Sequence, residues 1–182
     1  MSRESQFKLR FSPKEIRKWA SRYSYTSSNA DADLEKVIEQ EISPSVRAKG
    51  FYKKDEFLTL CRWKSPRVVP QCERNEASFV EAATAAAFDS THEHLRIAVL
   101  THLSGVSWPV ASVLLHFGHR DPYPILDFRA LWSVSVEVPS QYDFDCWWPY
   151  VEFCRSLALD SGASMRTLDR ALWQYSKENQ II

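Results

Sequence analysis

The sequence contains no apolar run long enough to cross a membrane. A spanning helix is expected to need roughly 18 or more predominantly apolar residues, and the apolar stretches of this chain are all interrupted sooner. Residues 1–11 also lack the apolar core of a secretion signal. We therefore expect a cytoplasmic protein with no membrane partner.

Metal-binding and disulfide motifs are missing as well. The four cysteines are Cys61, Cys72, Cys146 and Cys154, at separations of 11, 74 and 8 residues. These separations match no zinc or iron–sulfur motif and no small disulfide scaffold, and the five histidines follow no ligand pattern. We expect reduced, mostly buried thiols, no metal and no cofactor.

The chain has no net charge, which argues against a strong, sequence-blind affinity for polyanions. The charges are nevertheless unevenly distributed. Residues 1–25 contain seven Lys/Arg and two Glu, and residues 47–74 contain eight Lys/Arg and three acidic residues. Either these two basic segments share one DNA-facing surface, or they complement the acidic segments within the fold.

Strand-like alternation is confined to residues 134–145, which we interpret as a loop. Helix signals are frequent: Ser12 and Glu15 form a capping box, Asn75 caps an Ala-rich helix, and Pro66 and Pro70 bound a loop. We expect helices near residues 13–23, 32–41, 44–49, 53–65, 76–88, 91–103, 108–117, 128–134, 147–159 and 165–178. The prediction is an all-α protein.

The aromatic and hydrophobic content supports one compact domain. Hydrophobic residues make up 45% of the chain, which includes seven Trp and ten Phe, enough for a sizeable core at this length. We therefore expect a single helical domain over residues 1–182, with residues 1–50 as an accessory subdomain and with a helical hairpin and candidate catalytic segment over residues 92–134.

Two of the expected helices meet at a tight turn. Leu95, Val99 and Leu103 are predicted to share one face of the first helix, and residues 110–117 continue the apolar period in the second. Between the helices lies Ser104-Gly105-Val106-Ser107, in which Gly105 can take a positive φ and Ser107 can cap the next helix. Pro109 suits the first turn of that helix. The pattern predicts a helix-hairpin-helix.

A turn of this kind directs backbone N–H groups and a helix N-terminus at one point, which is one way to bind a phosphate. The sequence L-x-G-V-x-x-P-V-A-x-x-L-L followed by I-L-D-F-R-A-L resembles the helix-hairpin-helix DNA glycosylase superfamily. The resemblance implies two helical subdomains around a cleft, with the ends of the chain packed together and Asp127 at the mouth of the cleft. It also implies that Pro109 occupies the position of the catalytic Lys of bifunctional members, with Asp127 18 residues further on, as the family spacing requires. Ser107 stands where a second Gly is usual.

The resemblance assigns Asp127 as the catalytic residue. A fixed carboxylate can stabilise the positive charge that develops on deoxyribose as a base leaves, and it can orient a water molecule. From the residues alone, Asp127 is also a suitable N-cap for the helix that follows, and the two roles are compatible. Asp143 and Asp145 form an alternative pair that we interpret as helix-capping or solvated.

Further candidates surround these two elements. The expected DNA-backbone contacts are Gly105, Val106, Ser107, Trp108, Val110 and Lys64. The expected base-pocket residues are Trp63, Phe128 and Trp132. Trp63 lies between Arg62 and Lys64, an arrangement that can stack a base while binding phosphate, although it also suits the C-terminal end of an amphipathic helix.

Because proline has no free amine to form a Schiff base, the resemblance implies a monofunctional DNA glycosylase that acts as a monomer on duplex DNA and leaves an abasic site. Damaged bases and hypermodified bases of phage DNA both remain open as substrates. Two alternatives belong to other classes: a DNA-binding module that has lost catalysis, and a scaffold for protein interactions.

Overall fold

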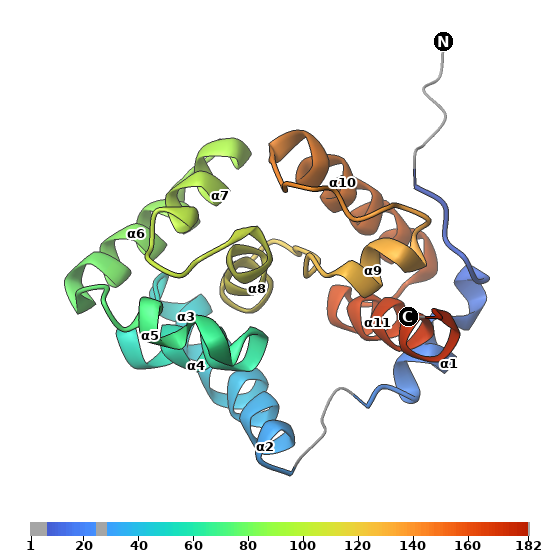
Figure 1. Ribbon diagram of the computed structural model, residues 1–182, viewed down its shortest axis with the longest axis horizontal. Coiled ribbons are helices and arrows are strands. Elements are labelled where there is room, and N and C mark those ends of the chain that lie inside the picture. The colour runs from blue at the N-terminus through green and yellow to red at the C-terminus, as the bar shows by residue number, and fades with distance from the viewer. Residues whose placement is uncertain (1–6, 25–28, 182) are drawn as a thin grey trace. The chain divides into compact units, whose positions relative to one another are not determined.

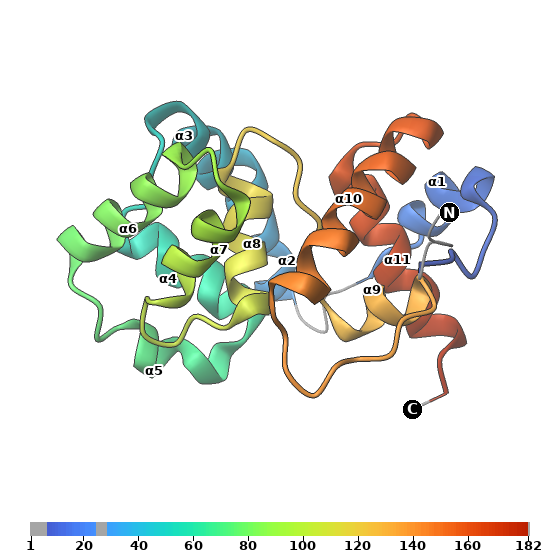
Figure 2. The same ribbon diagram turned by 90° about the horizontal axis from the view of Figure 1, so that it is seen from above.

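The computed structural model describes residues 7–24 and 29–181, and the regular structure in these two ranges is helical, with no strand. The expected all-α class is therefore confirmed. None of the helices in these ranges is both long and apolar enough to cross a membrane. The chain divides into two compact units: one is Thr26–Pro122, and the other combines Met1–Tyr25 with Tyr123–Ile182 (Figures 1 and 2).

The Thr26–Pro122 unit is built around one helix. Its elements are α2 (Asn29–Val37), η2 (Ile38–Ile42), α3 (Ser43–Lys49), α4 (Lys54–Lys64), η3 (Pro66–Val68), α5 (Val69–Cys72), α6 (Ala77–Asp89), α7 (Glu93–Thr101) and α8 (Trp108–Gly118). Helix α8 packs against α3, α4 and α7, and its residues 110–118 are all buried. A helix that is apolar on every side is one surrounded by protein, so α8 is the core helix of this unit.

Neighbouring side chains donate hydrogen bonds to carbonyl groups in the last two turns of α8. The hydroxyl of Tyr52 donates to the carbonyl oxygen of Leu114 at 2.9 Å, and the hydroxyl of Ser43 donates to that of Phe117 at 2.6 Å. Tyr52 is fully buried. These bonds fix the C-terminal end of α8 against α3 and the segment that follows it.

Helix α7 buries a different face from the one that the sequence suggested. Leu95 is 55% exposed, whereas Arg96, Ile97 and Leu100 are buried. The predicted inward position of Leu95 is therefore wrong, whereas Val99 is partly buried and Leu103 is buried as expected. The reason is Arg96, whose guanidinium is drawn inward by the carbonyl groups at the end of α6.

The second unit is organised around its last helix. Its elements are η1 (Pro13–Glu15), α1 (Ile16–Ser21), α9 (Phe128–Ser133), α10 (Phe144–Ser161) and α11 (Met165–Asn179). Helices α1, α9 and α10 all pack against α11 (Figures 1 and 2). The segment before η1 runs beside the end of α9, where the backbone N–H groups of Lys8 and Arg10 donate to the carbonyl oxygens of Val134 and Ser133, both at 2.9 Å.

Short-range signals located most helix ends. The N–H of Ser12 donates to the Glu15 carboxylate at 3.3 Å, as the capping box requires, and Gly50 and Gly162 end α3 and α10 in the left-handed conformation. The expected loop between Pro66 and Pro70 is wrong, because this segment forms η3 and α5. Both prolines lie in the first two positions of these short helices, where the missing N–H costs nothing.

Candidate functional site

The hairpin turn is present in the Thr26–Pro122 unit. Helices α7 and α8 are joined by residues 102–107, within which Gly105 has φ +81°. A Cβ on Gly105 would lie 2.7 Å from the Sγ atom of Cys72, closer than Cβ atoms in proteins approach, and 3.0 Å from the backbone nitrogen of Cys72, which is a tight contact. Two independent features therefore favour glycine at this position: the left-handed backbone conformation and the close contact with α5.

Asn75 fixes the turn from the opposite side. Its Oδ1 accepts from the backbone N–H of Ser104 at 2.8 Å, and its Nδ2 donates to the carbonyl oxygens of Ser104 and Cys72, both at 2.9 Å. The side chain is 5% exposed. The predicted role of Asn75 as the cap of α6 is wrong, because Glu76 holds the N-cap position and the amide is already used by the turn.

The backbone amides of the predicted clamp do not all point outward. The N–H of Val106 donates to the carbonyl oxygen of Leu103 at 3.0 Å, so it belongs to the turn itself. Pro109 has no N–H, and Ser107 is the N-cap residue of α8 but makes no side-chain cap bond. The first N–H groups of a helix have no acceptor within it, and in α8 these include the N–H groups of Trp108 and Val110 but none from Pro109.

Asp127 lies in the other unit, at the start of α9. Its Oδ1 accepts from the backbone N–H of Arg129 at 2.9 Å, which makes it the N-cap of the helix. The side chain stays partly exposed. The capping role is therefore confirmed. The structure brings Asp127, Phe128 and Trp132 together on α9, and it places the hairpin residues together in the Thr26–Pro122 unit.

Sequence reasoning missed one neighbour of Asp127. The pKa of the Tyr142 phenol is raised by its partial burial and by the negative charge of Asp127, which places the two groups within electrostatic range. A phenol that remains protonated can donate a hydrogen bond. Tyr142 lies next to the alternative carboxylate Asp143, whose Oδ1 accepts from the N–H of Cys146 at 2.8 Å as the N-cap of α10. That bond confirms the expected capping role of Asp143.

The candidate base-pocket residues differ in exposure. Trp63 is 7% exposed and packs edge-on against Phe117, with 5.5 Å between ring centroids, so its ring belongs to the core. Phe128 is 43% exposed. Trp132 is partly exposed and stacks on Tyr175 at 5.8 Å, and the guanidinium of Arg10 lies 4.4 Å from the centre of its ring. Lys64 is partly exposed at the end of α4.

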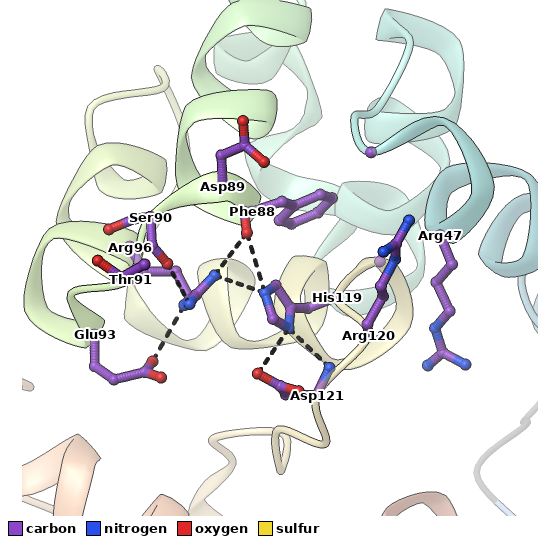
Figure 3. A pocket seen from close by; sticks show the side chains of 12 residues that line it. Arg47, Phe88, Asp89, Ser90, Thr91, Glu93, Arg96, His119, Arg120 and Asp121 are labelled. Carbon is purple, nitrogen blue, oxygen red and sulfur yellow. Dashed lines mark hydrogen bonds and ion pairs between the residues drawn. The ribbon is translucent and has the colours of Figure 1, made fainter.

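A cavity of about 550 Å³ lies in the Thr26–Pro122 unit, at the ends of α7 and α8 that are remote from the hairpin turn (Figure 3). It is lined by Arg47, Gly50, Phe88, Asp89, Ser90, Thr91, Glu93, Arg96, Gly118, His119, Arg120 and Asp121. Three arginines and three acidic residues share this lining, so it favours neither a cation nor an anion. No sequence motif marked it, because its residues come from three separate segments.

Two buried side chains form one wall of this cavity, and they point toward each other in Figure 3. The Nη1 atom of Arg96 donates to the carbonyl oxygens of Ala87 and Phe88 at 2.9 and 3.0 Å and lies 2.6 Å from Nε2 of His119. The Nδ1 atom of His119 accepts from the N–H of Asp121 at 2.9 Å. Burial and the charge of Arg96 lower the pKa of His119, so the imidazole is neutral and this wall has a structural role.

The thiols also have structural surroundings. Cys61, Cys72 and Cys154 are buried, Cys146 is partly exposed, and all four are free. A hydrogen bond to Cys72 and burial raise the pKa of the Cys61 thiol. Within the two described ranges, no three His, Cys, Asp or Glu side chains are grouped closely enough to hold a metal ion.

The geometry thus offers two chemical features, a hairpin turn with a left-handed glycine and a capping carboxylate at the start of α9. Comparisons of the chain with protein-family models, with curated proteins and with solved structures find no match.

Proposed function

We propose that the protein is a monofunctional DNA glycosylase that excises a damaged or modified base and leaves an abasic site. The observation that carries this proposal is Asp127, a partly exposed carboxylate fixed at the start of α9, 18 residues after Pro109 of the hairpin. The left-handed Gly105 supports it, because the turn has the backbone conformation that a phosphate-binding hairpin needs.

The proposed chemistry needs few groups. The target base must leave the stack before its bond to the sugar can be broken. As the base departs, the Asp127 carboxylate stabilises the positive charge that develops on the deoxyribose and orients a water molecule for attack. The N–H of Arg129 holds this carboxylate in one orientation, and Tyr142 is a protonated phenol within its electrostatic range.

The same proposal limits the reaction to base excision. The first turn of α8 carries Pro109 where an amine nucleophile would stand, and a proline within the chain cannot form a Schiff base. We expect borohydride to trap no covalent protein–DNA adduct. Trapping at a level that matches turnover would contradict this part of the proposal.

The partner in this proposal is duplex DNA, approached by a monomer in the cytoplasm. The substrate is either a damaged base or a hypermodified base of phage DNA. An alternative has its own supporting observation: the amide of Val106 is used within the turn and Pro109 has none, which leaves fewer phosphate donors and fits a DNA-binding module without catalysis. A scaffold for protein interactions is the third possibility.

One experiment distinguishes the three. Duplexes carrying a panel of damaged and phage-type bases are incubated with the protein, treated with alkali and examined for strand breaks, while fluorescence anisotropy reports binding. The glycosylase is supported by breaks that Asp127→Asn abolishes with binding retained. The matched control is Asp143→Asn, which also changes a capping aspartate. Because Asn caps helices as well as Asp does, both variants should fold, and only Asp127→Asn should be inactive.

The remaining outcomes are equally definite. Binding without breaks on every substrate identifies a binding module. No binding to any duplex identifies a scaffold and removes the glycosylase proposal. Equal loss of activity in the two aspartate variants would mean that Asp127 acts only through helix stability.

A further inference from the structure

The proposed function makes no use of the cavity of about 550 Å³ in the Thr26–Pro122 unit (Figure 3). Its volume lies within the range of roughly 300–1,000 Å³ that is common for small-molecule sites. Such sites are normally lined by apolar side chains, whereas charged side chains make up half of the residues that line this one. The cavity therefore suits a small ligand that carries charges of its own.

Part of the charge is balanced within the wall of the cavity. The Nε atom of Arg96 pairs with a carboxylate oxygen of Glu93 at 3.2 Å. The imidazole of His119 is neutral, because burial and the charge of Arg96 lower its pKa. The other charged groups of the lining therefore determine which ligand fits.

Two cations and two carboxylates remain. Arg47 and Arg120 form no ion pair with any residue in the described part of the chain, and neither does Asp89. All three are exposed, so a ligand can reach them. The carboxylate of Asp121 is also exposed, and its Oδ2 atom lies 3.9 Å from Nδ1 of the neutral His119. The charge that is left for a ligand is thus of both signs and sums to zero.

The cations and one of the carboxylates belong to different elements. Asp89 is the last residue of α6. Arg120 follows the end of α8, and Arg47 of α3 donates from its Nη2 atom to the carbonyl oxygen of His116 in α8 at 3.1 Å. In Figure 3 both arginines lie to the right of Asp89, and the ring of Phe88 lies between Asp89 and Arg120. A ligand that extends from the end of α6 to the end of α8 therefore meets a carboxylate at one end and a guanidinium at the other.

The buried Arg96–His119 pair holds both ends in place. The guanidinium of Arg96 donates to the carbonyl oxygens of three residues at the end of α6, two before Asp89 and one after it. Nδ1 of His119 accepts from the N–H of Asp121 at 2.9 Å, which fixes the backbone on both sides of Arg120. Because the backbone that carries these charges is already ordered, less free energy is lost in ordering the site when a ligand binds.

We propose that this cavity binds a small zwitterion that carries a carboxylate and an ammonium group, which is the chemistry of a free amino acid or of a short peptide. The ligand carboxylate pairs with the guanidinium of Arg120, and the ligand ammonium pairs with the carboxylate of Asp89. A phosphate compound would leave the carboxylates of the cavity without a partner, and a polyamine would leave the arginines without one. The proposal is independent of the proposed function, since it involves neither DNA nor Asp127.

The test is isothermal titration calorimetry of the full chain, without DNA, against the proteinogenic L-amino acids and the dipeptides Ala-Ala and Ala-Phe. At least one of these zwitterions should bind with a Kd of about 0.1–1 mM, as expected for partly solvated ion pairs. Tighter binding of the amino acids identifies a free amino acid as the ligand, and tighter binding of the dipeptides identifies a peptide. Inorganic phosphate and spermidine should bind at least about tenfold more weakly.

Two derivatives of the tightest zwitterion separate the two ends of the site. Its N-acetyl derivative has no ammonium charge and its amide has no carboxylate, so each should bind about two- to fivefold more weakly. Arg120→Gln should weaken binding of the zwitterion by a similar factor and leave that of the amide unchanged. Asp89→Asn should weaken binding of the zwitterion and leave that of the N-acetyl derivative unchanged.

The matched controls are Arg67→Gln and Asp55→Asn, which remove the same charges from exposed positions of the same unit outside the cavity. Both should bind the zwitterion as the original sequence does. Arg120 and Asp89 are exposed, and a carboxylate in the last turn of a helix opposes the helix dipole, so neither cavity variant should lose stability; thermal unfolding checks this.

Three results would overturn the proposal. The first is the absence of binding by every zwitterion at about 10 mM, well above the expected Kd. The second is binding of inorganic phosphate or spermidine as tight as that of the best zwitterion. The third is an affinity for the zwitterion that the cavity variants retain, or that the cavity and control variants lose equally. None of these results affects the glycosylase proposal, which depends on base excision alone.

Discussion

Gly105→Ala is the most direct test of the hairpin turn. The residue has φ +81°, a left-handed conformation that costs a residue with a Cβ roughly 1–2 kcal/mol. The new methyl group would lie 2.7 Å from Sγ and 3.0 Å from the backbone nitrogen of Cys72. Overpacking of this kind typically costs about 1–3 kcal/mol.

A third contribution has the opposite sign. Alanine restricts the unfolded chain more than glycine does, which stabilises the folded protein by about 0.4–1 kcal/mol. The free energy of unfolding of Gly105→Ala should therefore fall by about 2–4 kcal/mol relative to the original sequence. Urea titration followed by tryptophan fluorescence measures the change.

Gly50→Ala is the matched control for the backbone conformation. Gly50 has φ +83°, almost the same as Gly105, but a Cβ there would have nothing within 4 Å. Its loss of stability should be at most about 1.5 kcal/mol, because only the left-handed conformation opposes alanine. The difference between the two variants measures the contact with Cys72.

The reasoning is refuted if Gly105→Ala loses no more stability than Gly50→Ala. Combining Gly105→Ala with Cys72→Ala removes the sulfur atom from the overlap, so the two changes should be non-additive by at least about 0.5 kcal/mol, as expected for residues in contact. Strict additivity would place the strain elsewhere in the turn.

Two further predictions concern buried polar side chains. Asn75→Ala removes three hydrogen bonds that hold the turn and should lower the free energy of unfolding by about 2–4 kcal/mol. The control Asn179→Ala, on the surface, should change the free energy of unfolding by less than about 1 kcal/mol. Equal losses in the two variants would contradict the role of Asn75. Burial and the charge of Arg96 depress the pKa of His119 below its ordinary value of 6.5, so the unfolded chain binds the proton more readily than the folded protein does. The stability that the neutral imidazole contributes is therefore complete above pH 6.5, and it is lost as the pH falls toward the folded-state pKa. His119→Gln should reduce that loss in unfolding titrations between pH 7.5 and 5.5, and an unchanged pH dependence would exclude His119 as its source.

The sequence predicted the helices well because their ends depend on adjacent residues. The Ser12–Glu15 box and the left-handed Gly50 and Gly162 each act within one turn of chain. The same local reasoning identified Asp127 as a cap and Gly105 as a turn residue.

Predictions that depend on distant contacts were less successful. Asn75 has the sequence environment of a helix cap, yet the turn 29 residues further along the chain uses its amide. Trp63 lies between two cations in the sequence, but its ring is needed against Phe117 in the core.

Because the second unit combines two distant segments of the chain, its folding depends on the order of synthesis. The Thr26–Pro122 unit is one continuous segment, so all of it is available once Pro122 has left the ribosome. Helix α1 is synthesised before that unit but packs on α11, which is synthesised after it. Domains usually form in order of synthesis from the N-terminus, and here the rings of Phe11 and Trp19 stay uncovered until Tyr175 of α11, against which they pack, has been synthesised.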